Sequence, residues 1–256
     1  MKLMRMLNPL SNTVTVHAIK ELSLVINRGE SVGVIGRNGS GKSTLMKLVS
    51  GQVRPSIGAV HASSTPIMLG VNAALVPELS GDQNVVLGCL AMGLSHAQIA
   101  ERFDEIVEVS GLGKSIHLPM KSYSSGMGSR LRFAVAASAN PEILLVDEAL
   151  NTGDAQFAAR SKQRMDQLRS EAGCVLLVSH SLPTIRQMTT RTIWLDKGEL
   201  IMDGSSKEVT KAYMVFTKDL AKGNHDSATR FRAETQASLE KINIVDTSRR
   251  KKKGAC

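Results

Sequence analysis

Residues 36–43 read Gly-Arg-Asn-Gly-Ser-Gly-Lys-Ser, and they give the clearest indication of the fold class. It fits the pattern G-x-x-x-x-G-K-[ST]. It follows the apolar run Ser31–Ile35 and precedes the helical segment Lys42–Ser50, which Gly51 ends. In this strand–loop–helix context the glycines let successive backbone N–H groups point at phosphate oxygens, and the helix N-terminus adds positive potential. The alternative, a glycine-rich turn that binds nothing, is disfavoured because all parts of the context are present.

A loop of this kind predicts that the chain binds ATP together with Mg²⁺. The lysine side chain is expected to reach the β- and γ-phosphates, and the serine hydroxyl that follows it is expected to help hold the metal ion. The residues of this region that we expect to bind the nucleotide are Gly36, Asn38, Gly39, Ser40, Gly41, Lys42, Ser43 and Thr44.

A second feature is an apolar run that ends in two acids. Residues 143–148 read Ile-Leu-Leu-Val-Asp-Glu. A buried parallel strand delivers its last residues to the carboxyl edge of the sheet, where ligands bind. We expect Asp147 to hold Mg²⁺, with Ser43, and Glu148 to orient and deprotonate an attacking water. Many strands end in acidic residues, so the pattern gains its weight from the loop upstream.

The order of the other segments predicts an α/β fold with a mostly parallel sheet covered by helices. Short strands are expected at Leu22–Asn27, Ala59–His61 and Pro66–Leu69, and helices from about Asp82 to Asn140. After Glu142, strands and helices alternate along the chain: Ile143–Val146, Gln156–Arg169, Val175–Ser179, Pro183–Met188, Thr192–Leu195 and Leu200–Met202.

The stretch between Asp82 and Asn140 predicts a helical insertion. Ser95 and Gln98 have the spacing of a capping box. Behind them, apolar residues fall on one helical face at i, i+4, i+7 and i+8, namely Ile99, Phe103, Ile106 and Val107.

Composition limits where such a chain works. Cys89, Cys174 and Cys256 are far apart and have no metal-ligand spacing, which favours free thiols in a reducing cytosol. No apolar run approaches the roughly 18–20 residues that span a bilayer, and residues 1–10 do not resemble a signal peptide. If the protein serves a membrane process, we expect another chain to cross the membrane.

The net charge of +9 is concentrated near the end of the chain. The basic run Arg249–Lys253 could touch anionic lipid headgroups or nucleic acid, and a solvated tail without a specific partner is at least as well supported. We place no regular structure on residues 222–256.

Residues 123–127, Tyr-Ser-Ser-Gly-Met, resemble the signature motif of ABC ATPases, usually written L-S-G-G-Q. The resemblance implies that Ser124 and Gly126 bind the γ-phosphate held by an opposite subunit. A simple helix cap by Ser124 or Ser125 explains the same residues, and the two readings do not exclude each other.

Further matches to the same family follow in the right order. His180, at the end of an apolar strand, matches the switch histidine that contacts the γ-phosphate, although a lone histidine there is more often structural. Gly153 and Asp154 match the loop that crosses the dimer interface. Two departures stand out: Asn72 is the best candidate where the family has a glutamine, and His17 takes the place of the aromatic residue that stacks on adenine.

The resemblance covers residues 14–215 and implies a phosphate-loop NTPase (RecA-like) core, an N-terminal antiparallel β part and an α-helical ABC subdomain at about 82–140. We therefore expect an ABC ATPase domain at 1–221 and a basic C-terminal tail at 222–256. One chain carries only one set of motifs, so two copies are expected to form an ATP-sandwich homodimer.

Within the family, the sequence looks like ATPases that export polysaccharides and teichoic acids. The resembling stretches are residues 36–39, 77–81, 123–134 and 147–150. This implies a peripheral protein on the cytoplasmic face of the cell membrane, an integral-membrane permease subunit as partner, and a lipid-linked glycan of the O-antigen, galactan or teichoic acid type as substrate. The alternatives are the motor of another ABC transporter, or a soluble ABC ATPase that acts on the ribosome or on nucleic acid. Nucleic acid is disfavoured because the chain has neither a second ATPase unit nor a coiled coil.

Overall fold

The structure is a computed structural model that describes residues 17–69, 75–147, 155–240, 242 and 244, and a six-stranded sheet forms its centre. The strand order is β2-β3-β4-β1-β5-β6. Neighbouring strands from β2 to β5 are parallel, and β6 is antiparallel to β5. The strands are β1 (Ser31–Ile35), β2 (Ile67–Leu69), β3 (Ile143–Asp147), β4 (Cys174–Val178), β5 (Arg191–Asp196) and β6 (Glu199–Ser205).

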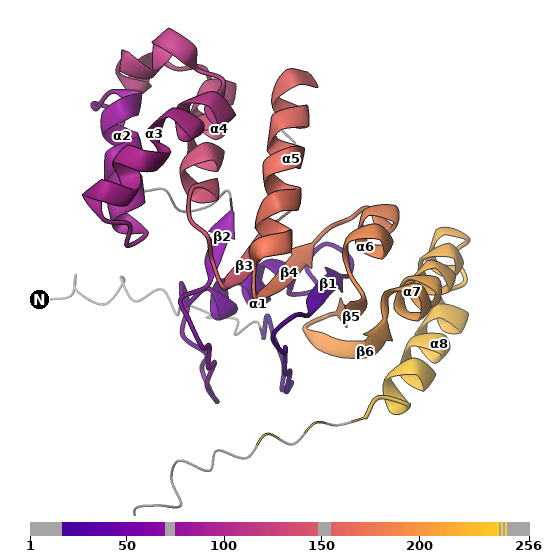
Figure 1. The fold of residues 1–256 in the computed structure, drawn as a ribbon. Coiled ribbons are helices and arrows are strands. Elements are labelled where there is room, and N and C mark those ends of the chain that lie inside the picture. Colours follow the sequence, from indigo (N-terminus) through magenta and orange to yellow (C-terminus); the bar gives the residue numbers. More distant parts are fainter. Residues whose placement is uncertain (1–16, 70–74, 148–154, 241, 243, 245–256) are drawn as a thin grey trace, which may run out of the picture.

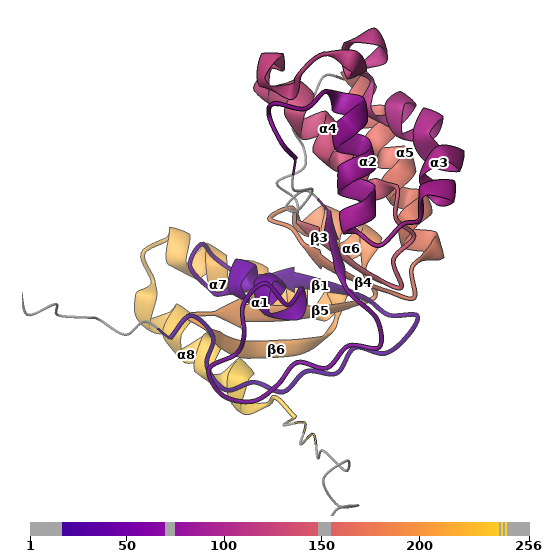
Figure 2. The ribbon, with the colours of Figure 1, turned by 90° about the vertical axis from the view of Figure 1, so that its left-hand side faces the viewer.

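Helices surround this sheet and gather at its two ends. In Figure 1, α2, α3 and α4 lie together beyond the β2 edge, and α7 and α8 lie beside β6 at the opposite edge; Figure 2 shows the same separation from the side. The α-helices are α1 (Lys42–Val49), α2 (Gly81–Ala91), α3 (His96–Ser110), α4 (Ser125–Ala137), α5 (Ala155–Glu171), α6 (Leu182–Met188), α7 (Ser206–Ala221) and α8 (His225–Ala237). Two 3₁₀ turns, η1 (Gly113–His117) and η2 (Met120–Ser122), connect α3 to α4.

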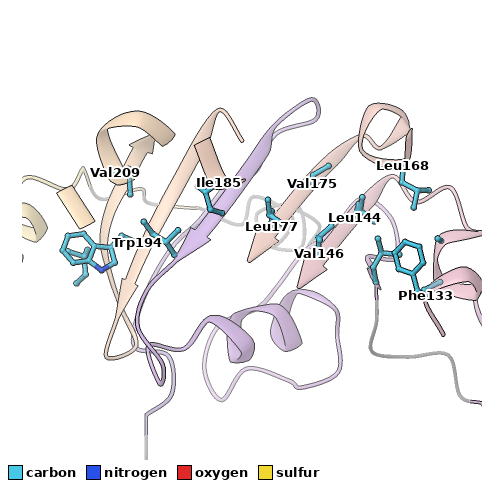
Figure 3. Packing of buried hydrophobic residues seen from close by; sticks show 14 of the residues in the cluster. Phe133, Leu144, Val146, Leu168, Val175, Leu177, Ile185, Trp194 and Val209 are labelled. Atoms are coloured by element: carbon cyan, nitrogen blue, oxygen red, sulfur yellow. The ribbon is translucent and has the colours of Figure 1, made fainter. Parts of the chain in front are cut away.

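Alternating side chains of the central strands build two apolar layers, as the two-residue period of a strand requires. On one face, Leu144, Val146, Val175 and Leu177 join Trp194 and residues of the helices, and Figure 3 shows this layer extending across the strands. On the other face, the intervening residues pack against α1, among them Leu145, Leu176 and Val178. Burying each such side chain stabilises the fold by about 1.5–3 kcal/mol, so this double layer holds the strand ends in place.

The predicted helical insertion is present. Ser95 and Gln98 form a capping box at the start of α3. Ile99 and Ile106 are buried against residues of α2 and α4 in a separate apolar cluster, which includes Leu131. The helices α2 to α4 therefore have a core of their own.

The expected strands Leu22–Asn27 and Ala59–His61 are not strands in the described part of the chain. Leu22, Leu24 and Ile26 are half-buried, with exposed residues between them, and they pack against the α1 face of the sheet. These apolar residues are therefore partly buried as in a strand, but the segment has no ladder of strand hydrogen bonds. Among the described residues, the antiparallel part of the sheet is the β5–β6 pair instead of an N-terminal one.

The prediction that residues 222–256 lack regular structure is wrong for residues 225–237, which form α8. This helix is mostly polar, and its one fully buried residue is Ala228. Its Arg232 pairs with Asp196 at the end of β5, and its Phe231 packs against the main apolar cluster. Across the ranges that the structure describes, no helix is both long enough and apolar enough to cross a bilayer.

Candidate nucleotide site

The carboxyl ends of three parallel strands bring the predicted site residues to one edge of the sheet. Val178 of β4 pairs with Val34 of β1 on one side and with Asp147 of β3 on the other. The phosphate loop follows β1, and His180 lies two residues beyond Val178. The sheet register therefore aligns the loop, Asp147 and His180 at the same level, as expected for the ligand-binding edge of an α/β sheet.

Two glycines of the loop are required by their surroundings. Gly36 has φ 154°, and a Cβ atom there would collide with the backbone oxygen of Leu195 at the end of β5. Gly41, the N-cap residue of α1, has φ 104°, and a Cβ atom there would lie 2.6 Å from the carbonyl oxygen of Ala18. At both positions a residue with a Cβ atom would be strained in the backbone and would collide with its neighbours. The loop is thus pressed between β5 and the segment that precedes β1.

Lys42 closes the loop from within. Its side chain is buried, and its Nζ atom donates to the carbonyl oxygens of Gly36 at 2.6 Å and Arg37 at 2.9 Å. Burial lowers the pKa of Lys42, while the negative charge of Asp147 opposes that shift. In the loop, the hydrogen-bond partners of the Lys42 ammonium are neutral carbonyl groups, and the acid Asp147 lies nearby. An ammonium in these surroundings is suited to bind an anionic ligand.

The other loop residues fit a phosphate group and a hard metal ion. Ser40 is buried, and its Oγ atom has no hydrogen-bond partner among the described residues, which is unusual for a buried hydroxyl. Ser43 is exposed on the first turn of α1, and Asp147 is half-buried. Hydroxyl and carboxylate oxygens are the ligand types that Mg²⁺ takes, usually together with phosphate oxygens and water. Asn38 and Gly39 are exposed and Thr44 is half-buried.

Ser124 caps α4. Its side-chain oxygen accepts from the backbone N–H of Met127 at 3.2 Å, so the helix-cap interpretation is confirmed. The side chain is exposed, and Gly126 in the first turn has almost no neighbours in the space a Cβ would take. Both residues lie at the start of α4 in the helical region, and not at the strand edge with the phosphate loop.

The remaining predicted residues fall in different places. His180 is exposed just after Ser179, whose Oγ atom accepts from the backbone N–H of Ser181 at 2.9 Å. His17 is exposed, and its carbonyl oxygen lies against Gly198 in the turn between β5 and β6. Glu148, Asn72, Gly153 and Asp154 lie outside the described residues.

The turn between β5 and β6 contacts the phosphate loop and is therefore part of the site, although it was not among the residues predicted from the sequence. The backbone N–H of Gly198 donates to the carbonyl oxygen of Ser40 at 3.0 Å, and Arg37 pairs with the buried Asp196. Lys197 and Gly198 both have positive φ, as a tight hairpin turn requires. A lysine–glycine pair between two apolar runs does signal such a turn, but nothing local shows that it supports the phosphate loop.

Comparisons with known proteins agree with this geometry. The family model described as ABC transporter matches residues 19–151. The teichoic acids export ATP-binding protein TagH of Lactococcus lactis is 38% identical over 224 residues, which cover 87% of this chain and 48% of that protein. TagH of Staphylococcus saprophyticus is 33% identical, with 90% of this chain and 87% of that protein covered. The ABC transporter protein AbcA of Aeromonas salmonicida is 34% identical over 81% of this chain and 68% of its own length. The chain thus spans about half of the Lactococcus relative.

Solved structures give the same fold. An ATP-binding subunit of an ABC transporter superimposes with a TM-score of 0.66 at 24% identity, covering 77% of this chain and 87% of that one. A dimeric ATP-binding cassette in a post-hydrolysis state, bound to ADP and Pi, superimposes with a TM-score of 0.62 at 23% identity, covering 75% and 91%. The α/β architecture with its mostly parallel sheet is therefore shared with these cassettes.

Proposed function

This chain belongs to the ABC transporter family, and from that membership we propose that it is the ATP-hydrolysing motor of an exporter for a lipid-linked glycan. The observation that carries the ATPase part is the buried Lys42 ammonium, enclosed by the glycine loop at the sheet edge where Asp147 also lies. The exporter part is supported by the relatives named for teichoic acid export.

The phosphate loop is proposed to bind the triphosphate. The N–H groups of the loop and of the first turn of α1 would face the phosphate oxygens, and the Lys42 ammonium, which uses two of its three donors on loop carbonyls, would direct the third at an anionic oxygen. The Ser40 hydroxyl would gain the partner that it lacks among the described residues. Each of these changes favours the bound state.

Ser43 and Asp147 are proposed to hold Mg²⁺, which when bound neutralises charge on the β- and γ-phosphates. In the described part of the chain, no group of three or more His, Cys, Asp or Glu side chains could hold a metal alone. The proposed ion would share its coordination between these two residues, phosphate oxygens of the nucleotide and water. Glu148 is proposed to take the proton of the attacking water, and His180 to contact the γ-phosphate.

A second copy of the chain is proposed to complete each site through Ser124 and Gly126. The Ser124 oxygen accepts the cap hydrogen bond from Met127, which leaves the hydroxyl proton available as a donor. The exposed start of α4 and the open space at Gly126 allow a phosphate to approach the backbone there. The cap and the proposed γ-phosphate contact are thus compatible.

The proposed partner is an integral-membrane permease, which would place the chain on the cytoplasmic face of the cell membrane. The test is affinity purification of the tagged chain from detergent-solubilised native membranes, with the bound proteins identified. A stoichiometric multispan membrane protein is the expected result. Ribosomal proteins or DNA-bound factors instead would overturn the exporter proposal in favour of a soluble ABC ATPase.

The ATPase proposal and the exporter proposal can each be wrong without the other, so the ATPase proposal has a test of its own. The purified chain is titrated with a fluorescent ATP analogue in the presence of Mg²⁺, and phosphate release is measured. Saturable binding and turnover are expected. A chain that is folded by circular dichroism but binds no nucleotide would refute the ATPase proposal.

A further inference from the structure

The β5–β6 turn lies between the phosphate loop and the C-terminal helix α8. On one side, the N–H of Gly198 donates to the carbonyl oxygen of Ser40 in the loop at 3.0 Å. On the other side, α8 packs along β6 beyond the sheet edge, and the side-chain amide of its residue Gln236 donates to the carbonyl oxygen of Leu200 at 3.2 Å. The turn is therefore the structural connection between the two elements.

A single carboxylate joins them more directly. Asp196 is 1% exposed, and its Oδ1 atom accepts from both Nε and Nη2 of Arg37, at 3.2 and 3.1 Å. Its Oδ2 atom accepts from Nε of Arg232 on α8, at 2.9 Å. Nη2 of Arg232 also donates to the backbone oxygen of Asp196 and to Glu199. A buried carboxylate held by two guanidinium groups has both of its oxygens fixed in position.

Arg37 connects the Asp196 carboxylate to the nucleotide site. It is the second residue of the phosphate loop, and its carbonyl oxygen is one of the two that accept from the Lys42 ammonium. Its guanidinium also lies over the ring of Phe216 on α7, 5.4 Å from the ring centre. The side chain of Arg37 is therefore anchored by C-terminal elements while its backbone faces the lysine.

We infer that α8 positions the phosphate loop for nucleotide binding, through Arg232, Asp196 and Arg37 in that order. Arg232 is a positioning residue, because it contacts neither the loop backbone nor Lys42. This inference rests on the proposed ATP binding at the loop. Without Arg232, the Oδ2 atom of Asp196 loses its charged donor, so Arg37 and the carbonyl oxygen that faces Lys42 are less firmly held.

The expected effect is weaker ATP binding in an Arg232→Gln variant. Residues that act through such a network change coupling enough to raise the Kd roughly 2- to 30-fold. The KM for ATP is expected to rise with it while kcat stays near the wild-type value, because a preformed loop serves the ground state and the transition state alike. Arg230→Gln is the matched control, since Arg230 is an exposed arginine of the same helix.

A second measurement needs no variant. If α8, when packed against β6, favours the loop conformation that binds ATP, then bound ATP must favour the packed position of α8 by the same factor. This follows because coupling between two sites is reciprocal. Hydrogen exchange of the α8 amides in the wild-type chain is therefore expected to slow when ATP and Mg²⁺ are added. The comparison uses those α8 amides that exchange by local opening, since a helix that only stabilises the fold would show no such dependence in them, whereas amides that exchange by global unfolding slow with any bound ligand.

The outcomes separate this inference from the proposed function. A raised Kd in Arg232→Gln but not in Arg230→Gln, with slower exchange in α8 on ATP binding, supports the inference. Tight ATP binding by the wild type, equal affinities in both variants and unchanged exchange in α8 would overturn it and leave the ATPase proposal intact. If Arg232→Gln does not fold, the exchange measurement alone decides. Absence of ATP binding by the folded wild type would overturn both.

Discussion

The Nζ atom of Lys42 donates to the carbonyl oxygen of Gly36 at 2.6 Å, so the lysine closes the loop that leads into its own helix. With Arg37 as the second acceptor, the ammonium is held inside the turn before any ligand arrives. The loop is therefore arranged in advance, and binding has to reorder little of it.

Replacing Lys42 with alanine is expected to abolish measurable ATP binding at micromolar nucleotide. Hydrogen bonds to charged groups contribute about 1.5–3 kcal/mol each, so losing even one to the phosphates weakens binding roughly 10- to 100-fold. Isothermal titration calorimetry measures this directly. The matched control is Lys47→Ala, an exposed lysine of the same helix, which should bind as the wild type does. Equal affinity in the two variants would count against the phosphate-loop assignment.

Replacing Glu148 with glutamine is expected to trap an ATP-bound dimer. Glutamine cannot take the proton of the attacking water, so hydrolysis stops while binding persists. Size-exclusion chromatography with light scattering, in ATP and Mg²⁺, should show a mass near twice that of the monomer, and ADP should not replace ATP in this effect. A variant that stays monomeric, or that hydrolyses ATP at the wild-type rate, would show that Glu148 is not the base.

Replacing Gly36 with alanine is expected to destabilise the fold as well as the site. The added Cβ would collide with the backbone oxygen of Leu195, which cannot move without disturbing β5. Forced conformations of this kind cost about 1–3 kcal/mol. Gly39→Ala is the control, since Gly39 also has positive φ but has nothing within 4 Å of the added atom. Urea denaturation should give the lower free energy of unfolding for Gly36→Ala, and the reverse order would contradict this explanation.

Acid is expected to weaken the packing of α8. Hydrogen bonds from Lys20 and Arg232 lower the pKa of Glu199 from its ordinary value of 4.5 to about 2. A carboxylate with a lowered folded pKa adds stability above its unfolded pKa and loses that stability as the pH falls toward the folded value. The free energy of unfolding should therefore decline between about pH 5 and pH 2. In Glu199→Gln this decline should be shallower by urea denaturation; an identical pH dependence would show that the ion pairs add nothing.

Much of the sheet could be predicted because its signals are local. Ser31–Ile35 was predicted with the observed bounds, and Ile143–Val146 falls one residue short of β3. Each of these strands is a short apolar run between turn residues and is buried on both faces. The composition of the run is therefore enough to predict a strand. The capping box at Ser95 is likewise contained in four residues of sequence.

The parts that were missed depend on distant partners. Helix α8 buries little apolar surface, and Arg232 finds Asp196 only after the chain has folded, so no periodic pattern marks the helix. A strand was expected at Leu22–Asn27, yet Leu22 and Ile26 meet side chains of the α1 face and not a neighbouring strand. The same limit applies to the site: residues 36–43 identified the loop, but the role of Asp196 behind it depends on contacts across the sheet.

The strand order has a consequence for how the chain acquires its structure during synthesis. Strand β1 leaves the ribosome before its neighbours β4 and β5, so Ser31 pairs with Val175, and Val32 with Arg191, only after those later strands have been made. Pairings so distant along the chain close slowly, and an unpaired apolar strand is prone to aggregate meanwhile. The helices α2 to α4, which have a core of their own and local contacts, can fold during that interval. The phosphate loop is thus synthesised before the strands that hold it in place, and it is completed only after β4 and β5 have paired with β1.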